Sequence, residues 1–237
     1  MDLSIVIPTL EEEKYLPLLL RSIKKQNFSQ EYEIIVADAG SKDRTVEIAK
    51  SEGCMVIQGG LPAYGRNKVA KVAKCKLILF ADADIIFPDN SLEQFVIEFE
   101  KRSLDLAGFL LRPCGNNRLL EMLYDVFYNI PAFLMEKFLP HSVGAIMIKS
   151  RFYEKIGGFD EEIKIGEDHI YSRKAFRVGK FGLLKSFKIY YSQRRFKRDG
   201  LVRTYLKYFL AELYLVFLGP IKSDIFQYDL QVRRFKD

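Results

Sequence analysis

The stretch LILFADAD, residues 77–84, places two carboxylates directly after five consecutive apolar residues. A strand that is apolar on both sides is typical of the centre of a parallel sheet, where helices cover both faces. Asp82 and Asp84 follow this strand one residue apart, so both side chains can reach the same cleft. Carboxylate oxygens suit Mg²⁺ or Mn²⁺, which commonly also bind a substrate phosphate. Asp-x-Asp alone is a weak signal, and an acidic cap on the strand end is the alternative.

Outward from this strand, predicted strands and helices alternate along the first hundred residues. Strands are predicted at 3–7, 33–37, 54–57 and 77–81, and helices at 11–26, 43–50, 62–74 and 90–101. The order predicts an α/β fold with a doubly wound, mostly parallel sheet flanked by helices. In such sheets, ligands bind beyond the carboxyl ends of the strands. The polar residues at these ends are Thr9, Glu11, Asp38, Asp82 and Asp84.

Two amphipathic helices are predicted in the second half, over 118–139 and about 201–218. Pro131 should kink the first helix or split it in two. The apolar faces of both helices either lie at a membrane surface or pack on the sheet or on another subunit. We expect one domain at 1–200, in which the alternating strands and helices of 1–100 are followed by a second half at 101–200. The amphipathic helix and tail at 201–237 follow, and the apolar residues of 220–237 pack back on the domain or on a partner.

Composition excludes a disordered chain and a disulfide scaffold. The 237 residues are 49% hydrophobic and include three cysteines, which show neither a disulfide framework nor zinc spacing. Two histidines, His141 and His169, leave little room for a multi-histidine metal site. The sequence contains no run of eighteen apolar residues and no secretory pattern. We expect a cytoplasmic protein, either soluble or attached to the inner face of the cell membrane.

The net charge of +6 is concentrated toward the C-terminus. Between Arg173 and Lys207, twelve Lys or Arg residues accompany a single acid, Asp199. Such a surface suits nucleic acid, anionic lipid or a phosphorylated substrate, and a solvated basic face is an equal alternative. The chain shows no recognisable nucleic-acid motif, so we expect no nucleic-acid partner.

Three further motifs carry candidate chemistry. Asp38, in IIVADAGSKDRT (residues 34–45), can accept hydrogen bonds from a ribose or a base edge. Glu167 and Asp168, in GFDEEIKIGEDHIYSRKAF (158–176), either cap a helix or supply a general base for an acceptor hydroxyl. Arg194 and Arg195, in YYSQRRF (190–196), suit a diphosphate or form a solvated charge pair.

Taken in order, these motifs resemble the family 2 glycosyltransferases. The resemblance is carried by SIVIPTLEEEKYL (4–16), IIVADAGSKDRT, YGRNKVAKVAKCKLILFADADIIFPDN (64–90), the region 142–180 that contains GEDH, and YYSQRRFKRDGLVRT (190–204). It extends to about residue 205 and is weakest at 115–140 and after 220. Members of this family are inverting enzymes with a nucleotide-sugar-binding GT-A fold. The resemblance implies a GT-A domain at 1–200, with a nucleotide-binding half at 1–100 and an acceptor and catalytic half at 101–200.

The resemblance implies a role for each matching residue. The nucleotide-binding residues would be Pro8, Thr9, Glu11, Asp38, Arg66, Asp82, Arg194 and Arg195. Asp38 would contact the base, and Arg66, in the GRN that matches the family's ARN, would approach the diphosphate. Relatives often have two acids where this chain has Asp38 and Ala39, which weakens the argument about base identity.

The chemistry implied by the resemblance is a metal-assisted single displacement. Asp84, with Asp82 beside it, would bind Mn²⁺ or Mg²⁺, and Asp168 would act as catalytic base with Glu167 positioning it or the acceptor. His169 follows the base, and we expect it on the helix surface or at the acceptor rather than at a metal. UDP is the favoured donor nucleotide and GDP a possible one, while the acceptor is open, with a lipid-linked phosphate or a glycolipid among the candidates.

Two other functions fit the sequence less well. An inactive nucleotide-sugar-binding protein or membrane scaffold would not need both Asp84 and Asp168, which the chain has. A sugar-nucleotide pyrophosphorylase would need a Gly-rich loop with an arginine after the first strand, and PTLEEE (8–13) is not such a loop.

Overall fold

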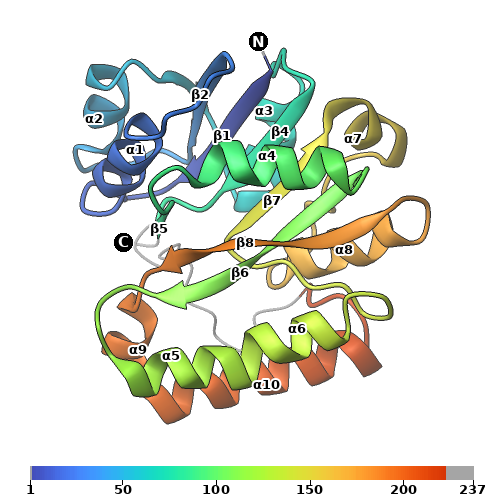
Figure 1. Cartoon of the computed structure of the whole chain (residues 1–237). Coiled ribbons are helices and arrows are strands. Elements are labelled where there is room, and N and C mark those ends of the chain that lie inside the picture. Colours follow the sequence, from blue (N-terminus) through green and yellow to red (C-terminus); the bar gives the residue numbers. More distant parts are fainter. Residues whose placement is uncertain (1, 223–237) are drawn as a thin grey trace.

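The computed structural model describes residues 2–222, and one mixed sheet organises them (Figure 1). The strand order is β3-β2-β1-β4-β7-β6-β8-β5. Strands β3, β2, β1 and β4 are parallel, β7 runs antiparallel to β4 and β6, and β6 pairs with β8 in parallel. The predicted α/β fold with a largely parallel sheet is therefore confirmed. The predicted packing of the tail lies mainly at 223–237, outside the described residues.

The first half follows the predicted alternation closely. Its elements are β1 (Leu3–Thr9), α1 (Leu16–Lys24), β2 (Tyr32–Asp38), α2 (Thr45–Ser51), β3 (Met55–Gln58), α3 (Pro62–Ala70), β4 (Leu77–Ala81), β5 (Ile85–Ile86) and α4 (Ser91–Lys101). Helix α1 begins later than predicted because the chain at Glu11 adopts a left-handed conformation (φ 54°) that a helix cannot contain.

The second half contributes three further strands that the sequence analysis did not predict. Its elements are β6 (Leu106–Pro113), α5 (Arg118–Tyr124), η1 (Asp125–Asn129), α6 (Ile130–Leu134), β7 (Ala145–Lys149), α7 (Ser150–Ile156), α8 (Glu167–Phe176), β8 (Phe181–Tyr191), α9 (Arg194–Asp199) and α10 (Leu201–Phe217). Strands β6 and β8 pair along their length with a register shift after Phe109. The strands of this half therefore complete the sheet that the first half begins.

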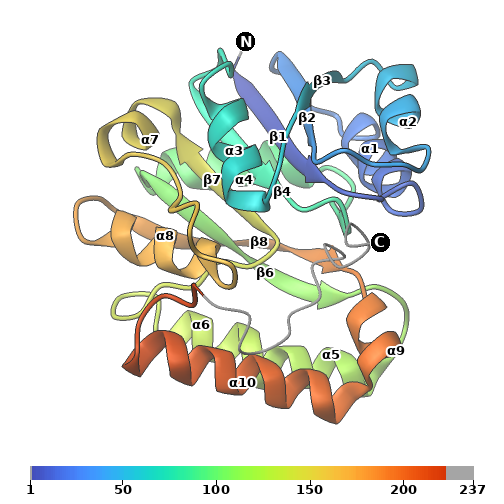
Figure 2. The same cartoon turned by 180° about the vertical axis from the view of Figure 1, so that it is seen from behind.

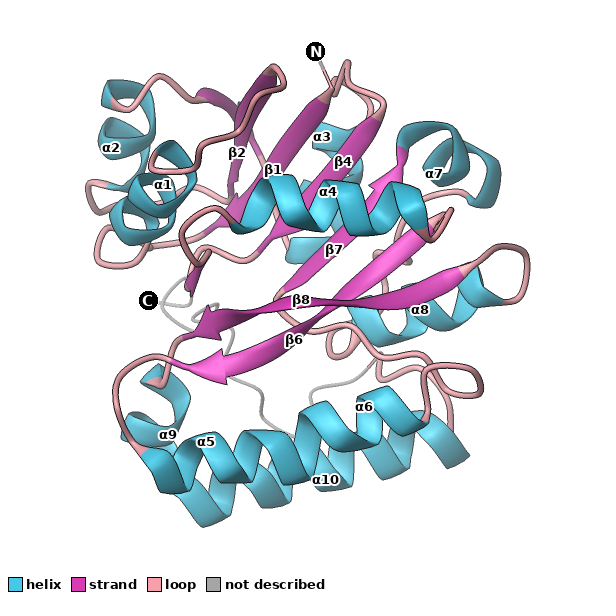
Figure 3. Cartoon of the chain, viewed as in Figure 1, coloured by secondary structure: helices cyan, strands magenta, loops and turns pink. Residues whose placement is uncertain are grey.

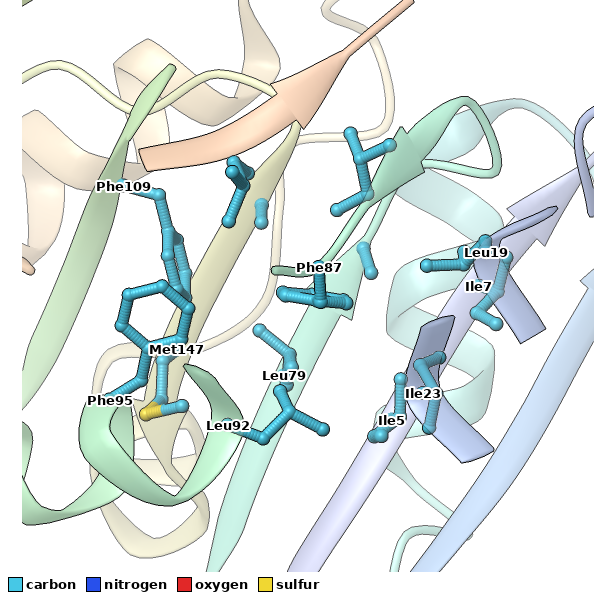
Figure 4. Close-up of a cluster of buried hydrophobic side chains, with 14 of the residues drawn as sticks. Ile5, Ile7, Leu19, Ile23, Leu79, Phe87, Leu92, Phe95, Phe109 and Met147 are labelled. Atoms are coloured by element: carbon cyan, nitrogen blue, oxygen red, sulfur yellow. The ribbon is translucent and has the colours of Figure 1, made fainter. Parts of the chain in front are cut away.

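Helices cover both faces of the sheet (Figures 1 and 2). Side chains alternate across β1, so Ile5 and Ile7 pack under α1 and α4, whereas Val6 packs toward α3. Figure 4 shows the first of these cores, in which Leu19 and Ile23 of α1 meet the sheet. The two cores hold the strands rigidly, and the loops at their carboxyl ends are built on this frame.

The segment 118–134 is helical but irregular. A π-helical turn, η1, separates α5 from α6, and Pro131 lies in the first turn of α6. Proline donates no backbone hydrogen bond, and the wider turn accommodates this. The buried amide of Asn129 donates to the carbonyl of Leu111 and accepts from its N–H, both at 2.8 Å, and so fixes the turn to β6. The helical run therefore continues past Pro131, and its irregularity is the π-helical turn that precedes the proline rather than a split at Pro131.

Helices α5, α6 and α10 form a layer at one end of the molecule (Figure 3). Phe127 and Tyr205 place their ring centroids 5.3 Å apart and join the two helical segments. The opposite side of α10 packs through Ala211 and Leu215 on Ile165 and Ile221. Within residues 2–222, no helix is both long and apolar enough to cross a membrane.

Candidate active site

A buried arginine joins two of the predicted acids. Arg66 of α3 lies 2.7 Å from Asp82 Oδ1, after β4, and 2.6 Å from Glu167 Oε1, in the first turn of α8. Its guanidinium also lies 5.4 Å from the ring centroid of Phe159. Burial opposes ionisation of Arg66, but the neighbouring carboxylates outweigh it and raise its pKa. The two acids come from segments far apart in sequence, and Arg66 holds them at one place.

The residue after Arg66 fixes the loop that carries this centre. Asn67 Oδ1 accepts from the Tyr153 hydroxyl at 2.7 Å and from the Phe159 N–H at 2.8 Å, and its Nδ2 donates to the Phe159 carbonyl at 2.9 Å. Gly158 approaches Asn67 so closely that a Cβ would lie 2.3 Å from its Oδ1. Asn67 lies in the GRN motif, but no sequence pattern predicts this structural role for it.

Asp168 lies beside the Arg66 centre, in the first turn of α8. Its Oδ1 accepts from the backbone N–H of His169 at 2.9 Å. Burial and the charge of Glu167 raise the pKa of Asp168 well above its usual range, although Arg66 acts in the opposite direction. A carboxylate with a raised pKa is a stronger proton acceptor, which is the property that a general base needs.

A second arginine joins two further acids at the other side of the strand ends. Arg194 of α9 places Nη1 2.8 Å from both oxygens of Glu12 and Nε 2.8 Å from Asp84 Oδ2. Its guanidinium lies 5.0 Å from the ring centroid of Tyr15. Burial raises the pKa of Glu12 to about 7 and also raises that of Asp84, while Arg194 opposes both shifts.

Glu12 is the acid that the sequence analysis missed. The run Glu11-Glu12-Glu13 offers three neighbouring candidates, and the analysis selected Glu11. In the structure Glu12 is buried against Arg194. The backbone N–H of Glu11 donates to the Ser41 hydroxyl oxygen at 2.8 Å. Only the backbone conformation at Glu11 decides which side chain turns inward, and no pattern in the sequence reveals it.

The predicted nucleoside residues lie together at the ends of β1 and β2. Pro8 and Thr9 end β1, and the Thr9 hydroxyl donates to Asp38 Oδ1 at 3.0 Å. Asp38 also accepts from the N–H groups of Gly40 and Ser41, at 2.9 and 2.8 Å, and from the Ser41 hydroxyl. A carboxylate has about four acceptor sites, and these four hydrogen bonds occupy them. Asp38 therefore holds the loop 38–41 in place. Its contact with a base remains a prediction.

The two predicted basic residues of YYSQRRF diverge. Arg194 reaches the site described above, whereas Arg195 Nη1 lies 3.4 Å from the Tyr208 hydroxyl on α10. The charge of Arg195 nevertheless acts on Asp84 and lowers its pKa. Both side chains therefore contribute positive potential beside Asp84, but only Arg194 forms an ion pair with it.

A cleft of about 920 Å³ opens beside Asp84 and Arg194. Its walls come from α1, the strand end at Asp84, the 114–119 loop and α9, and they include Tyr15, Leu18, Arg118, Leu119 and Lys197. Pockets for small organic ligands are typically of this size. Thr9, Asp38 and Asp168 do not line the cleft, because the Glu12–Arg194 pair lies next to it.

His169 is predicted on the helix surface or at the acceptor, and its side chain is only 16% exposed, so it does not lie on the surface; its contact with an acceptor stays a prediction. Its side chain is mostly buried and faces Glu212 of α10 and His141 rather than solvent. Burial and the proximity of His141 lower its pKa to about 3. Helix α10 packs over this side of α8 and covers His169, which the sequence pattern predicts to be exposed.

Comparison with known proteins agrees with this geometry. Residues 4–178 match the model of glycosyl transferase family 2. Poly(ribitol-phosphate) beta-N-acetylglucosaminyltransferase TarS of Staphylococcus aureus is 23% identical over 211 residues, which cover 82% of this chain and 36% of TarS. Poly(ribitol-phosphate) beta-glucosyltransferase of Bacillus spizizenii is 26% identical over 213 residues, covering 84% of this chain and 33% of that protein. The chain thus spans about a third of these relatives.

Solved structures show the same fold. S. aureus TarS 1-349 in complex with UDP-GlcNAc superposes with a TM-score of 0.66 at 21% identity, covering 90% of this chain and 67% of that one. The mannosyltransferase PcManGT of Pyrobaculum calidifontis, in complex with GDP-Man and Mn²⁺, gives 0.68 at 16% identity, covering 89% and 64%. The fold is that of the GT-A glycosyltransferases. Because the family match spans most of its length, the chain belongs to glycosyl transferase family 2.

Proposed function

We propose that this protein transfers a sugar from a nucleoside-diphosphate sugar to an acceptor by a single displacement that inverts the anomeric centre. The observation that carries the proposal is the Arg66 centre, which gathers Asp82 and Glu167 beside the buried Asp168. One carboxylate with a raised pKa serves as base, and no covalent nucleophile is required. We assign this activity to a catalytic domain at 1–200, with 201–237 as an addition to it.

Asp84, with Asp82 near it, would hold a divalent cation. Carboxylate oxygens are the ligands that Mg²⁺ and Mn²⁺ prefer. Asp84 Oδ2 is buried and lies 2.8 Å from Arg194 Nε, but it accepts no hydrogen bond. This oxygen could therefore bind the cation if Arg194 moved away. When bound, the cation would stabilise charge on the diphosphate leaving group. The Mn²⁺ in PcManGT and in a mycobacterial glucosyl-3-phosphoglycerate synthase supports this assignment.

The residues of the chain then divide the reaction between them. Asp168 accepts the proton of the acceptor hydroxyl, and Glu167, held by Arg66, keeps the base in place. Arg194 binds the diphosphate by exchanging one of its carboxylates for phosphate oxygens, which guanidinium groups bind bidentately. Pro8, Thr9, Glu11 and Asp38 form the nucleoside pocket. We favour UDP as the nucleotide because TarS binds UDP-GlcNAc. GDP is the alternative, because PcManGT binds GDP-Man.

A nucleotide panel tests this function. UDP, GDP, CDP and their sugars are titrated by calorimetry with and without Mn²⁺, in the wild type and in Asp84→Ala. We expect one diphosphate to bind, more tightly with metal, and the metal effect to vanish in the variant. No binding to any of them, by protein with an unchanged circular dichroism spectrum, would overturn the transferase assignment and favour a scaffold.

We also propose that the layer of α5, α6 and α10 lies on an anionic membrane. Exposed apolar side chains follow one another at helical spacing along both segments: Leu119, Met122, Val126, Ile130 and Phe133 on one, and Val202, Leu206, Phe209, Leu213 and Phe217 on the other. Phe138, in the turn after α6, is exposed too. Phe138 is 76% exposed and Phe217 77% exposed, which is unusual for phenylalanine in water. Arg118, Lys197 and Arg203 at one end of this layer are exposed and complement anionic headgroups.

The cleft beside Asp84 connects this layer with the chemistry. Arg118 and Lys197 line it together with Leu18 and Leu119, so it offers both positive charge and apolar walls. Such a lining fits an acceptor that carries a phosphate next to a lipid. A lipid-linked acceptor would reach the reacting sugar from the membrane, at the inner face of the cell membrane.

Vesicle flotation tests the membrane contact. We expect the wild type to float with vesicles containing anionic lipid and Phe209→Glu/Phe217→Glu to remain in solution. A matched double charge on the distant apolar positions, Met55→Glu/Val72→Glu, should not change flotation. Failure of the wild type to float, or dimerisation that the two substitutions abolish, would overturn the membrane assignment and identify a protein partner instead.

A further inference from the structure

Three potential metal ligands from separate parts of the chain converge beside α8. They are His141, in the loop before β7, His169 of α8 and Glu212 of α10, and one ligand atom from each lies within 4.8 Å of the others. Among residues 2–222, no other group of three His, Cys, Asp or Glu residues brings its ligand atoms this close together. His141 Nε2 is 2.9 Å from Glu212 Oε1, and His169 Nδ1 is 3.5 Å from Oε2. Figure 2 shows α8 and α10 facing each other here.

The group formed by His141, His169 and Glu212 has fewer N–H donors than lone pairs that face one another. His141 Nδ1 lies 2.7 Å from the carbonyl oxygen of Leu139, so this nitrogen carries the proton of a neutral ring. Its Nε2 then presents a lone pair to a Glu212 oxygen, which also presents lone pairs. His169 Nδ1 is buried without a hydrogen bond. An extra proton would satisfy the first contact only, whereas one cation between the three atoms satisfies all of them.

The distances suit a tetrahedral ion. Bonds of about 2.0–2.1 Å to Zn²⁺ place neighbouring ligand atoms about 3.3–3.4 Å apart. The separations of 2.9 Å to Glu212 Oε1 and 3.5 Å to Glu212 Oε2 lie on either side of this value. One ligand atom from each of the three residues lies within 4.8 Å of the others, so the side chains must close slightly around the ion. Two histidines and one glutamate with one open position form a recognised zinc ligand set. The three side chains are 15%, 16% and 30% exposed, so an ion and a water molecule can reach the open position.

The surrounding contacts are those of ligands held in place. Ligating histidines usually donate their other N–H to a carbonyl or carboxylate, and ligating carboxylates are themselves hydrogen-bonded. His141 donates to Leu139, and Arg173 Nη2 lies 2.5 Å from Glu212 Oε1. His169 Nε2 faces Asp168 Oδ1 at 3.8 Å. The positive charge of Arg173 weakens cation binding, and it contacts only one of the two carboxylate oxygens.

We propose that His141, His169 and Glu212 bind a transition-metal ion of the Zn²⁺ type, distinct from the cation at Asp84. Imidazole nitrogens favour Zn²⁺ over Mg²⁺, which binds oxygen ligands. The ion joins α10 to α8 and to the loop before β7, and it fixes the ring that lies next to Asp168. The inference does not depend on the proposed transferase function, because it concerns metal binding by the folded chain.

The experiment uses the full chain carrying Asp84→Asn, which removes the other cation site, after dialysis against a chelator. Zn²⁺ affinity and stoichiometry are measured by competition with a chromophoric chelator, and Co²⁺ replaces Zn²⁺ for visible absorption spectra. We expect one equivalent of Zn²⁺ and the intense bands of tetrahedral Co²⁺. Adding His141→Gln or Glu212→Gln should weaken binding by about 100-fold or more. Glu162→Gln, at an exposed position, is the matched control and should bind normally.

Two results would overturn the proposal: no stoichiometric Zn²⁺ binding by folded Asp84→Asn protein, or unchanged binding after Glu212→Gln. A protonated His141 would then account for the contact with Glu212. Should His141→Gln unfold, the Co²⁺ spectrum of the Asp84→Asn protein still decides, because weak octahedral bands would exclude the site. Failure of the transferase assignment would appear separately, in the nucleotide titrations.

Discussion

Arg66 and Arg194 each hold two carboxylates at the strand ends, but their surroundings differ. The Arg66 side chain is 6% exposed and sits on a helix packed against β1 and β2. The Arg194 side chain is 26% exposed and belongs to α9, a six-residue helix without a buried residue. A short helix with little packing can move at low cost, whereas a buried helix cannot.

The difference separates a fixed part of the site from an adjustable one. Arg66 is buried and forms ion pairs with Asp82 and Glu167, so we expect it to keep both partners when a substrate binds. Arg194 borders the cleft and holds Glu12 and Asp84, whose raised pKa values show that neither carboxylate is strongly stabilised in its charged form. Such acids can release the arginine when phosphate oxygens or a cation arrive. The following predictions test this division.

The largest effect is expected beside Arg66, on activity. Asp168→Asn removes the proton acceptor but keeps the shape of the side chain, so turnover should fall by about 10²–10⁴-fold. Binding of the donor nucleotide, measured by calorimetry, should remain within about twofold of the wild type. Retention of full turnover would exclude Asp168 as the base.

The next effect concerns stability. Arg66→Met leaves the partly buried Asp82 and Glu167 without their shared counter-charge, which should lower the free energy of unfolding by about 3–5 kcal/mol. Arg194→Met should cost less than about half as much, since Glu12 and Asp84 take up protons readily. Urea denaturation at pH 6 measures both variants. Equal losses would contradict the contrast between a fixed and an adjustable centre.

Glu12 should give the Arg194 centre a pH dependence. Burial raises its pKa from 4.5 to about 7, so the folded state binds more protons than the unfolded state between these values. The carboxyl is neutral in both states below about pH 4.5, and stability decreases as pH rises toward 7. The shift corresponds to about 3 kcal/mol.

The pH experiment compares the wild type with Glu12→Gln, because His169 and Glu212 also titrate abnormally and are common to both proteins. The wild type should lose stability relative to the variant between pH 4.5 and 7 and no more above pH 7.5. A constant difference across this range would show that Glu12 has an ordinary pKa.

The smallest effect is expected for Asp84→Ala. It removes one ligand of the expected cation and one partner of Arg194, so metal-dependent donor affinity should fall by at least about tenfold, or about 1.4 kcal/mol. Affinity measured without metal should change less, because Arg194 remains. A variant whose binding still strengthens with Mn²⁺ would move the cation away from Asp84.

The sequence predicted the first half of the fold well because each element there has a local signal. The apolar run 77–81 is a central strand, and the alternation around it defines the sheet. The strands β6, β7 and β8 were missed because their pairing is long-range. For example, β6 pairs with β8 across a register shift, and no turn or spacing near either strand indicates this partner.

The candidate site shows the same division. The sequence, through its motif order, named Asp84, Asp168, Arg66 and Arg194, since each lies in a recognisable local pattern. It did not show that Arg66 joins Asp82 to Glu167, nor that Glu12 rather than Glu11 meets Arg194. These pairings depend on backbone conformation and on segments up to 182 residues apart.

What the sequence determined by itself is therefore the set of elements and of chemical groups, because hydrophobic periodicity and motif order are local properties of the chain. Which of these groups meet depends on the three-dimensional fold. The fold places two histidines that no sequence pattern connects around Glu212, and it leaves the apolar stripes of α5, α6 and α10 exposed. Contact and exposure depend on which surfaces the fold brings together, and no local pattern records that.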